Sequence, residues 1–144
     1  MVIDAHYHPA FIKEVCGNEE LAQRRRNDMA YYKTGVAEVK RIKERMRSSG
    51  VDRCFLLPHD YSTVSGDRIS NEEMKDLVEL GEGMFYGFAS VDPNQEDAGE
   101  KLEYAFRELN LSGLKLHPSK QGFYPNDKKM YGLYETCVKY NKPI

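Results

Sequence analysis

Two histidines separated by one residue stand near the start of the chain, in the segment Val2-Ile3-Asp4-Ala5-His6-Tyr7-His8. The segment is apolar enough to form a strand, and residues two apart in a strand point to the same side. His6 and His8 would then project together from the carboxyl end of that strand. Two neutral imidazoles in this arrangement supply half of a zinc-type site. We therefore predict that both are metal ligands; the alternative is a pair of polar residues at a strand end.

A second polar pair alternates with leucines in the segment Gly113–Pro118. Leu114 and Leu116 would share one face of a strand, and Lys115 and His117 would share the other. In a closed barrel the polar pair must face the interior, because the outer face packs on helices. A buried lysine needs an anion, so we expect Lys115 to contact a substrate anion, a carboxylate or a metal-bound group. The alternative for Lys115 is a structural ion pair. For His117 we expect contact with substrate or acid–base chemistry, and the alternative is simple packing at the rim.

Further polar residues follow the first two predicted strands. His59 comes directly after the second, where it would contact substrate or belong to a merely polar loop. A long insertion spans Pro9 to Gly35, and loops on this face of a barrel select substrates. It carries side chains suited to binding carboxylates, although an exposed charged helix is equally open; these are Arg24, Arg25, Arg26, Tyr31 and Tyr32.

Short apolar runs alternate with helical patterns along the whole chain. The runs predict strands at Met1–Ala5, Arg53–Pro58, Phe85–Val91 and Gly113–His117. Apolar residues at spacings of three and four predict helices over 36–46, 74–78, 98–109 and 130–138. Ser70 and Glu73 have the spacing of a capping box, and Asn126 or Asp127 would cap the last helix. The order β-α-β-α-β-α-β-α favours a parallel sheet in an α/β fold.

The spacing of the units distinguishes two α/β architectures, an open doubly wound sheet and a barrel. No Gly-x-Gly-x-x-Gly follows any strand, which removes the dinucleotide-binding fingerprint of the open sheet. A complete (β/α)8 TIM barrel needs about 250 residues, so four units make half of one. The last residues, Asn141–Ile144, look like the junction that leads into a fifth strand. We expect residues 1–144 to form a single domain, the N-terminal half of a TIM barrel with about its first four βα units.

Composition and charge narrow the class of partners. The 144 residues carry a formal net charge of −2, which gives no general attraction to nucleic acid or to an anionic membrane. The basic run Lys40–Arg47 alternates with apolar residues and indicates a solvated helix face. No apolar run approaches the ~20 residues of a membrane span, and no signal peptide is apparent. With three widely separated cysteines, we expect a cytoplasmic protein that binds a small-molecule substrate, without nucleic-acid or membrane partners.

At this point the residues resemble a known family. Ile3–Pro9 looks like the opening of the amidohydrolase superfamily. Gly113–Pro118, Tyr131–Glu135 and Asn141–Ile144 resemble its amidohydrolase-related (family 2) branch, which includes aminocarboxymuconate-semialdehyde decarboxylase-like enzymes and lactonases. The resemblance implies a (β/α)8 barrel with a divalent metal, usually zinc, for which His6 and His8 match the two strand-one ligands. The remaining ligands and the acid–base histidine of the family come from later strands, so catalytic residues are expected beyond Ile144.

Taken together, these features predict a metal-dependent hydrolase that uses a metal-activated water on a small, anionic substrate. Zinc is the expected ion, and manganese or another divalent ion is the alternative. The second hypothesis for the reaction is non-oxidative decarboxylation by a metal-dependent enzyme of the same family. A hypothesis from another functional class is a non-catalytic half-barrel that acts by self-assembly. Four strands alone would expose sheet edges, so we also expect a homo-oligomer.

Overall fold

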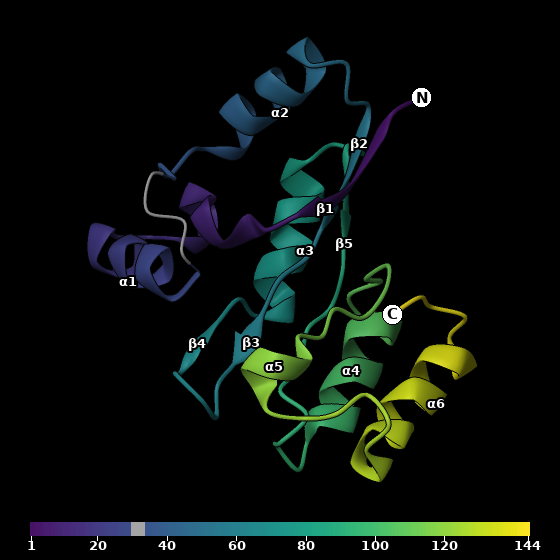
Figure 1. Ribbon diagram of the computed structural model, residues 1–144. Coiled ribbons are helices and arrows are strands. Elements are labelled where there is room, and N and C mark those ends of the chain that lie inside the picture. The colour runs from purple at the N-terminus through teal and green to yellow at the C-terminus, as the bar shows by residue number, and fades with distance from the viewer. Residues whose placement is uncertain (30–33) are drawn as a thin grey trace.

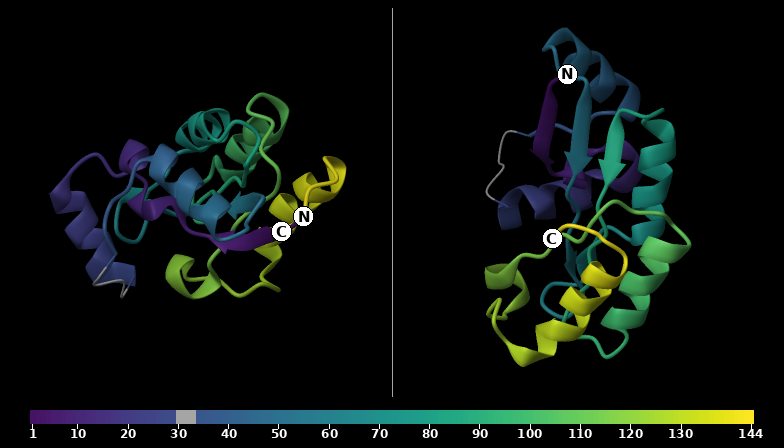
Figure 2. Two further views of the ribbon diagram at one scale, coloured as in Figure 1. Left: turned by 90° about the horizontal axis from the view of Figure 1, so that it is seen from above. Right: turned by 90° about the vertical axis from the view of Figure 1, so that its right-hand side faces the viewer.

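The computed structural model describes residues 1–29 and 34–144. Its main sheet has three parallel strands, and their order in space follows their order in the chain. These strands are β1 (Ile3–Tyr7), β2 (Arg53–Leu56) and β5 (Phe85–Gly87). They lie side by side with their carboxyl ends at one edge of the sheet (Figures 1 and 2). The parallel order predicted from the alternation of elements is confirmed.

The fourth predicted strand is reduced to one bridge beside β5, between Ala89 and Leu114. The backbone N–H of Lys115 donates to the carbonyl of Ala89 at 2.7 Å, which fixes its parallel register. On the other side, the N–H of Leu114 donates to the carbonyl of Pro143 at 2.9 Å. The segment at Pro143 therefore lies where a fifth strand of the sheet would lie, as its sequence indicates.

Four helices follow the predicted apolar stripes. They are α2 (Val39–Ser48), α3 (Asn71–Leu80), α4 (Ala98–Arg107) and α6 (Tyr131–Lys139). The capping box of α3 is confirmed, since the Ser70 hydroxyl accepts from the Glu73 N–H and the Glu73 carboxylate accepts from the Ser70 N–H. The cap predicted for the last helix is wrong. A short 3-10 turn, η3 (Lys128–Met130), precedes α6, and the Asp127 carboxylate accepts from the Tyr124 N–H instead.

Short elements absent from the prediction cluster at the carboxyl ends of the strands. After β1 the chain forms η1 (Pro9–Phe11), η2 (Lys13–Val15) and α1 (Glu19–Met29). After β2 it forms an antiparallel hairpin of β3 (Asp60–Tyr61) and β4 (Asp67–Arg68). The short helix α5 (Pro118–Gln121) follows the fourth strand position. Elements of two to four residues are too short to show a hydrophobic period, which explains why sequence patterns miss most of them.

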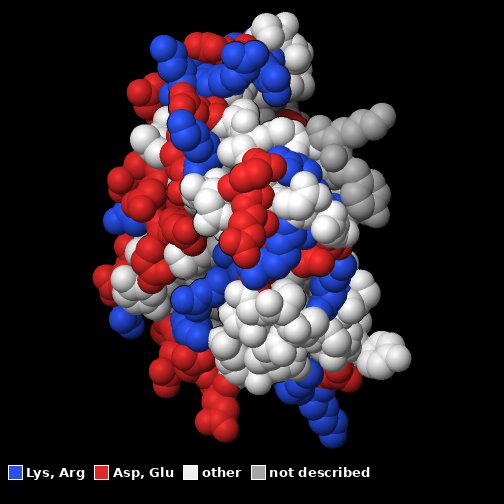
Figure 3. Space-filling model, turned by 90° about the vertical axis from the view of Figure 1, so that its left-hand side faces the viewer, with Lys and Arg blue, Asp and Glu red and all other residues white. Residues whose placement is uncertain are grey.

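The apolar side chains of the helices and strands form one core, whose fully buried members include Leu56, Met74 and Leu102. The strand β1 is apolar in sequence but is not fully buried, because Ile3 is 43% exposed. Among the described residues β1 pairs only with β2, so it is an edge strand. The basic side chains of α2 gather at the top of the molecule in Figure 3, as a solvated helix face would. Within the described residues, no helix is long and apolar enough to cross a membrane.

Gly113 is a position where the close approach of Phe88 and Pro143 leaves no room for a side chain. A Cβ atom there would lie 2.8 Å from Cδ1 of Phe88 and 2.9 Å from the Pro143 carbonyl oxygen. We expect Gly113→Ala to lower the free energy of unfolding by about 1–3 kcal/mol through overpacking. Gly132→Ala is the control, because no atom lies within 4 Å of its Cβ position on α6. It should stabilise the protein by up to about 1 kcal/mol, and urea denaturation of both variants measures the contrast.

Candidate metal centre

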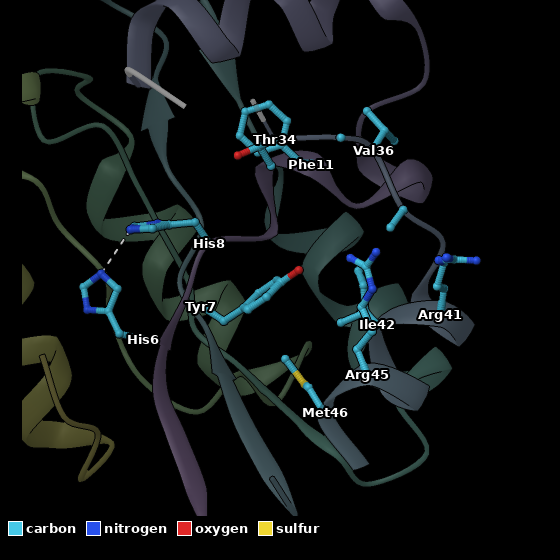
Figure 4. A pocket seen from close by; sticks show the side chains of 12 residues that line it. His6, Tyr7, His8, Phe11, Thr34, Val36, Arg41, Ile42, Arg45 and Met46 are labelled. Carbon is cyan, nitrogen blue, oxygen red and sulfur yellow. Dashed lines mark hydrogen bonds between the residues drawn. The ribbon is translucent and has the colours of Figure 1, made fainter. Parts of the chain in front are cut away.

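His6 lies in β1 and His8 directly follows it, and their side chains face each other on the same side of the chain. The Nε2 atoms of His6 and His8 are 3.0 Å apart, and the rings meet edge to face with centroids 4.8 Å apart. Figure 4 shows both imidazoles on one side of β1 and Tyr7 on the other. The alternation predicted from sequence therefore places the two ring nitrogens together.

An irregularity in β1 lies beneath this pair. Asp4 is the register partner of Cys54, but the next partners are Tyr7 and Leu56, so β1 contains one more residue than β2 over this stretch. The carboxylate of Asp4 accepts a hydrogen bond from the backbone N–H of His6 at 3.0 Å. Asp4 thus supports the backbone at the irregular position, which aims the His6 side chain.

The His8 ring is oriented by a hydrogen bond to the backbone directly after β2. Its Nδ1 lies 3.2 Å from the carbonyl oxygen of Leu57, which identifies Nδ1 as the protonated nitrogen and turns Nε2 toward His6. Metal-binding histidines commonly have such a backbone partner, because it fixes the tautomer and the orientation of the ring. Burial lowers the pKa of His8, the Leu57 carbonyl opposes this, and the positive charge of Lys115 lowers the pKa further. The neutral imidazole is the form that binds a metal.

The separation of the two Nε2 atoms fits a shared divalent ion. With metal–nitrogen bonds of about 2.0–2.1 Å and angles between about 90° and 109°, two histidine nitrogens lie about 2.8–3.4 Å apart. The observed 3.0 Å falls within this range. Across residues 1–29 and 34–144, no group of three or more His, Cys, Asp or Glu side chains is arranged to hold an ion. This part of the chain therefore offers two ligands of a site, and further ligands would have to come from elsewhere.

A cavity of about 680 Å³ opens beside the histidine pair, between β1 and α2 (Figure 4). Its walls include the apolar side chains of Phe11, Ile42 and Met46. Arg41 and Arg45 lie at its outer side.

His59 is buried beside a carboxylate. It is 4% exposed, and its Nε2 lies 2.9 Å from Oδ2 of Asp67, which is also 4% exposed. Burial by itself would raise the pKa of Asp67, but hydrogen bonds from His59 and Arg25 hold it well below its usual range. His59 is thus held in a buried hydrogen-bonded network and does not belong to an exposed polar loop, while its contact with substrate stays a prediction.

The insertion after β1 contributes a buried arginine. Arg25 on α1 is 1% exposed and forms an ion pair with Asp67 at 2.9 Å. The alternative of an exposed charged helix is therefore wrong for Arg25, and it holds for Arg24, whose side chain is 52% exposed. Tyr31 and Tyr32, also considered for substrate selection, lie outside the described residues. A single buried charge on a polar helix has no periodic signal, so sequence reasoning cannot separate Arg25 from its neighbours.

The polar pair of the fourth strand position lies on the same side as His8, since the charge of Lys115 acts on both His8 and His117. Lys115 is half-buried, its Nζ donates to the Leu116 carbonyl at 3.2 Å, and burial lowers its pKa. The structural ion pair considered for Lys115 has no carboxylate to form it among the described residues. His117 is also half-buried; its backbone N–H donates to Gln121 Oε1 at 2.7 Å, and its Nδ1 lies 3.3 Å from the Ser119 hydroxyl. The structure therefore gathers Lys115, His117 and His8 at one edge of the sheet.

The sequence model of one protein family, described as amidohydrolase, matches residues 3–144. The chain belongs to the amidohydrolase family. Its membership of the family 2 branch is confirmed by the same match, as indicated by the segments Gly113–Pro118, Tyr131–Glu135 and Asn141–Ile144.

Solved structures agree on the fold of this amidohydrolase. It resembles 4-oxalomesaconate hydratase from Rhodopseudomonas palustris with a TM-score of 0.66 and 22% identity, over 99% of this chain and 51% of that one. It resembles 5-carboxyvanillate decarboxylase from Novosphingobium aromaticivorans, solved with bound manganese, with a TM-score of 0.65 and 18% identity, over 99% and 49%. An uncharacterised TIM-barrel protein from Bordetella bronchiseptica matches with a TM-score of 0.67 and 15% identity, over 96% and 52%. The amidohydrolase chain is thus a partial TIM barrel that spans about half the length of these proteins.

A curated sequence relative carries a different name. A transcriptional repressor, NrdR, from Streptococcus suis is 34% identical over 83 residues, which are 58% of this chain and 44% of that one. The amidohydrolase match covers nearly the whole chain, whereas this alignment covers less than half of the repressor. The family assignment therefore rests on the longer match.

In this amidohydrolase, the charge of Lys115 is expected to control the pKa of His117. Burial lowers the pKa of His117, and the positive charges of Lys115 and Lys120 lower it further. Lys115→Met removes the nearer cation, so the pKa of His117 should rise, while Lys120→Met should have a smaller effect. An NMR titration of the His117 ring resonances measures both shifts. An unchanged pKa in Lys115→Met would show that the two side chains do not interact.

Proposed function

We propose that the protein is a metal-dependent hydrolase that acts on a small molecule bearing a carboxylate. One observation carries the metal dependence: the two Nε2 atoms of His6 and His8 lie 3.0 Å apart, and the Leu57 carbonyl orients the His8 ring. The amidohydrolase match supports the same chemistry. Zinc is the ion proposed first, and manganese has independent support because it is bound in the decarboxylase of similar fold. A divalent ion would supply Lewis acidity that polarises a carbonyl group or acidifies a water molecule.

The proposed substrate class follows from Lys115. Its ammonium group is half-buried and has no carboxylate partner among the described residues. Desolvating a cation costs free energy, and a substrate carboxylate would offset that cost. The positive charge of Lys115 lowers the pKa of His117, so the two side chains are close, and we propose that His117 contacts the same bound molecule. Lys115 would hold the anionic group of the substrate, while His6 and His8 would hold the ion.

Non-oxidative decarboxylation is the second candidate reaction. It is favoured by the similarity to 5-carboxyvanillate decarboxylase, which was solved with 3-methoxy-4-hydroxy-5-nitrobenzoic acid. In either reaction Lys115 would bind a carboxylate of the substrate, and the two reactions would differ in the acid–base groups around the scissile bond. We further propose a cytoplasmic enzyme, consistent with the three cysteines being free thiols. A homo-oligomer is proposed from the exposed edge of β1.

The test is a metal-dependence assay on the full-length protein. The purified enzyme is treated with a chelator and then supplied with zinc or manganese, and each form is assayed with lactones of carboxylated compounds and with carboxylated phenols. Lactone opening would support hydrolysis, and release of carbon dioxide from the phenols would support decarboxylation. Activity that survives chelation, or a protein that binds neither ion, would refute the proposal.

A further inference from the structure

Arg25 uses all of its hydrogen-bonding capacity inside the protein. Its Nε and Nη2 donate to the Asp67 carboxylate at 2.9–3.2 Å, and Nη2 also donates to the Arg68 carbonyl at 3.2 Å. Its Nη1 donates to the carbonyls of Ala10 and Val15, both at 2.9 Å. A guanidinium has five N–H groups in a rigid plane, and all five point at acceptors here. The orientation of the Arg25 side chain is therefore fixed.

One branch of this network leads to the strand that carries the metal ligands. Ala10 stands two residues after His8, and its carbonyl is held by Arg25 Nη1 at 2.9 Å. The carbonyl of Val15 is held by the same nitrogen, so the turn formed by η1 and η2 is fastened to α1 at two points. The segment that follows His8 is thus anchored by a side chain from the insertion.

The other branch leads across the carboxyl edge of the sheet. Asp67 accepts from both Arg25 and His59, and the His59 ring stacks on Tyr61 with centroids 4.8 Å apart and an angle of 22°. Tyr61 in turn meets the His117 ring edge to face, with centroids 6.3 Å apart. A continuous series of contacts therefore joins α1 to His117 through the β3–β4 hairpin.

We propose that Arg25 is a positioning residue of the metal centre, which holds His8 from one side and His117 from the other. This inference rests on the proposed function, because it assigns a role toward the ion and substrate that His8 and His117 would bind. It gives the insertion after β1 a purpose that is distinct from contact with substrate. Arg25 touches neither group directly and acts through the Ala10 backbone and through Asp67, His59 and Tyr61.

The energetics of the network favour positioning over stability alone. Burying an ion pair costs desolvation free energy that is often not recovered, and apolar side chains of similar volume can stabilise a fold equally well. A salt bridge with directional hydrogen bonds fixes the relative orientation of the groups that it joins, which apolar packing does not. The three segments that Arg25 joins all leave the sheet at its carboxyl edge, where the candidate site lies.

The first test compares manganese affinity in the full-length Arg25→Met and Arg24→Met proteins. Arg24 is the matched control, since it lies next to Arg25 on α1 but is half-exposed and 3.8 Å from Asp67. Calorimetry at a temperature where circular dichroism shows each variant folded should give about 10–100-fold weaker binding for Arg25→Met, as for loss of other groups that orient metal ligands, and no change for Arg24→Met. Equal affinities of wild type and folded Arg25→Met would overturn the positioning role. Absence of manganese and zinc binding in the wild type would instead refute the proposed function.

The second test needs no metal and tolerates a destabilised Arg25 variant. Tyr61→Leu removes the ring between His59 and His117, whereas Tyr61→Phe retains it. In spectra of protein labelled with 15N-histidine, the ring signals of His117 should shift in Tyr61→Leu and return to their wild-type positions in Tyr61→Phe. His117 signals that are the same in all three proteins would show that the hairpin does not position this residue.

Discussion

Asp67→Ala is expected to lower the free energy of unfolding by about 3–5 kcal/mol, a large part of the total for a domain of this size. The substitution leaves the Arg25 guanidinium and the His59 ring buried without the carboxylate that both contact. Chemical denaturation at neutral pH measures the loss. Glu19→Ala is the control, because the Glu19 side chain is itself exposed in its pair with Arg26, and its removal should cost no more than about 1 kcal/mol.

The same carboxylate makes the stability depend on pH. The pKa of Asp67 is lowered in the folded protein from an ordinary value of 3.8. A lowered pKa contributes stability that is fully present above the pKa of the unfolded chain and is lost as the pH falls toward the folded value. The difference in stability between wild type and Asp67→Ala should therefore be constant at neutral pH and shrink below about pH 4. A difference that grows on acidification would contradict the ion pairing.

His6→Ala and His8→Ala are each expected to weaken zinc and manganese binding by more than about 100-fold, beyond the loss typical of an outer contact. Each removes one of two nitrogens that lie 3.0 Å apart. His8→Ala also removes the contact with the Leu57 carbonyl. Calorimetric titration of the full-length protein, together with metal analysis after dialysis, measures the affinity and the stoichiometry.

Tyr7→Phe provides the matched control for both histidine variants. Tyr7 lies between His6 and His8 in the chain, but its ring points to the opposite side of β1 (Figure 4). Its replacement should leave metal binding unchanged. Binding that persists in His6→Ala and His8→Ala, or that is lost in Tyr7→Phe, would place the ion on the wrong face of the strand and contradict the site.

The local features of this protein are readable from the sequence because they depend on neighbours in the chain. The spacing of His6 and His8 sets their common side through the two-residue period of a strand, and the facing rings agree. The capping box at Ser70 is a contact over three residues, and it forms as the motif predicts. The order of the parallel sheet follows from the alternation of strand and helix patterns, which restricts the topology to right-handed crossovers.

The tertiary structure alone decided which charged residues are structural. Arg24, Arg25 and Arg26 are identical as side chains, yet only the orientation of α1 buries Arg25, against a carboxylate 42 positions away in the chain. His59 is drawn into the same network and away from the open site by a hairpin too short to predict. Such contacts depend on the packing of distant segments, and no spacing in the sequence encodes them. The histidine pair was thus determined by local periodicity, whereas the surroundings that hold it were determined by the fold.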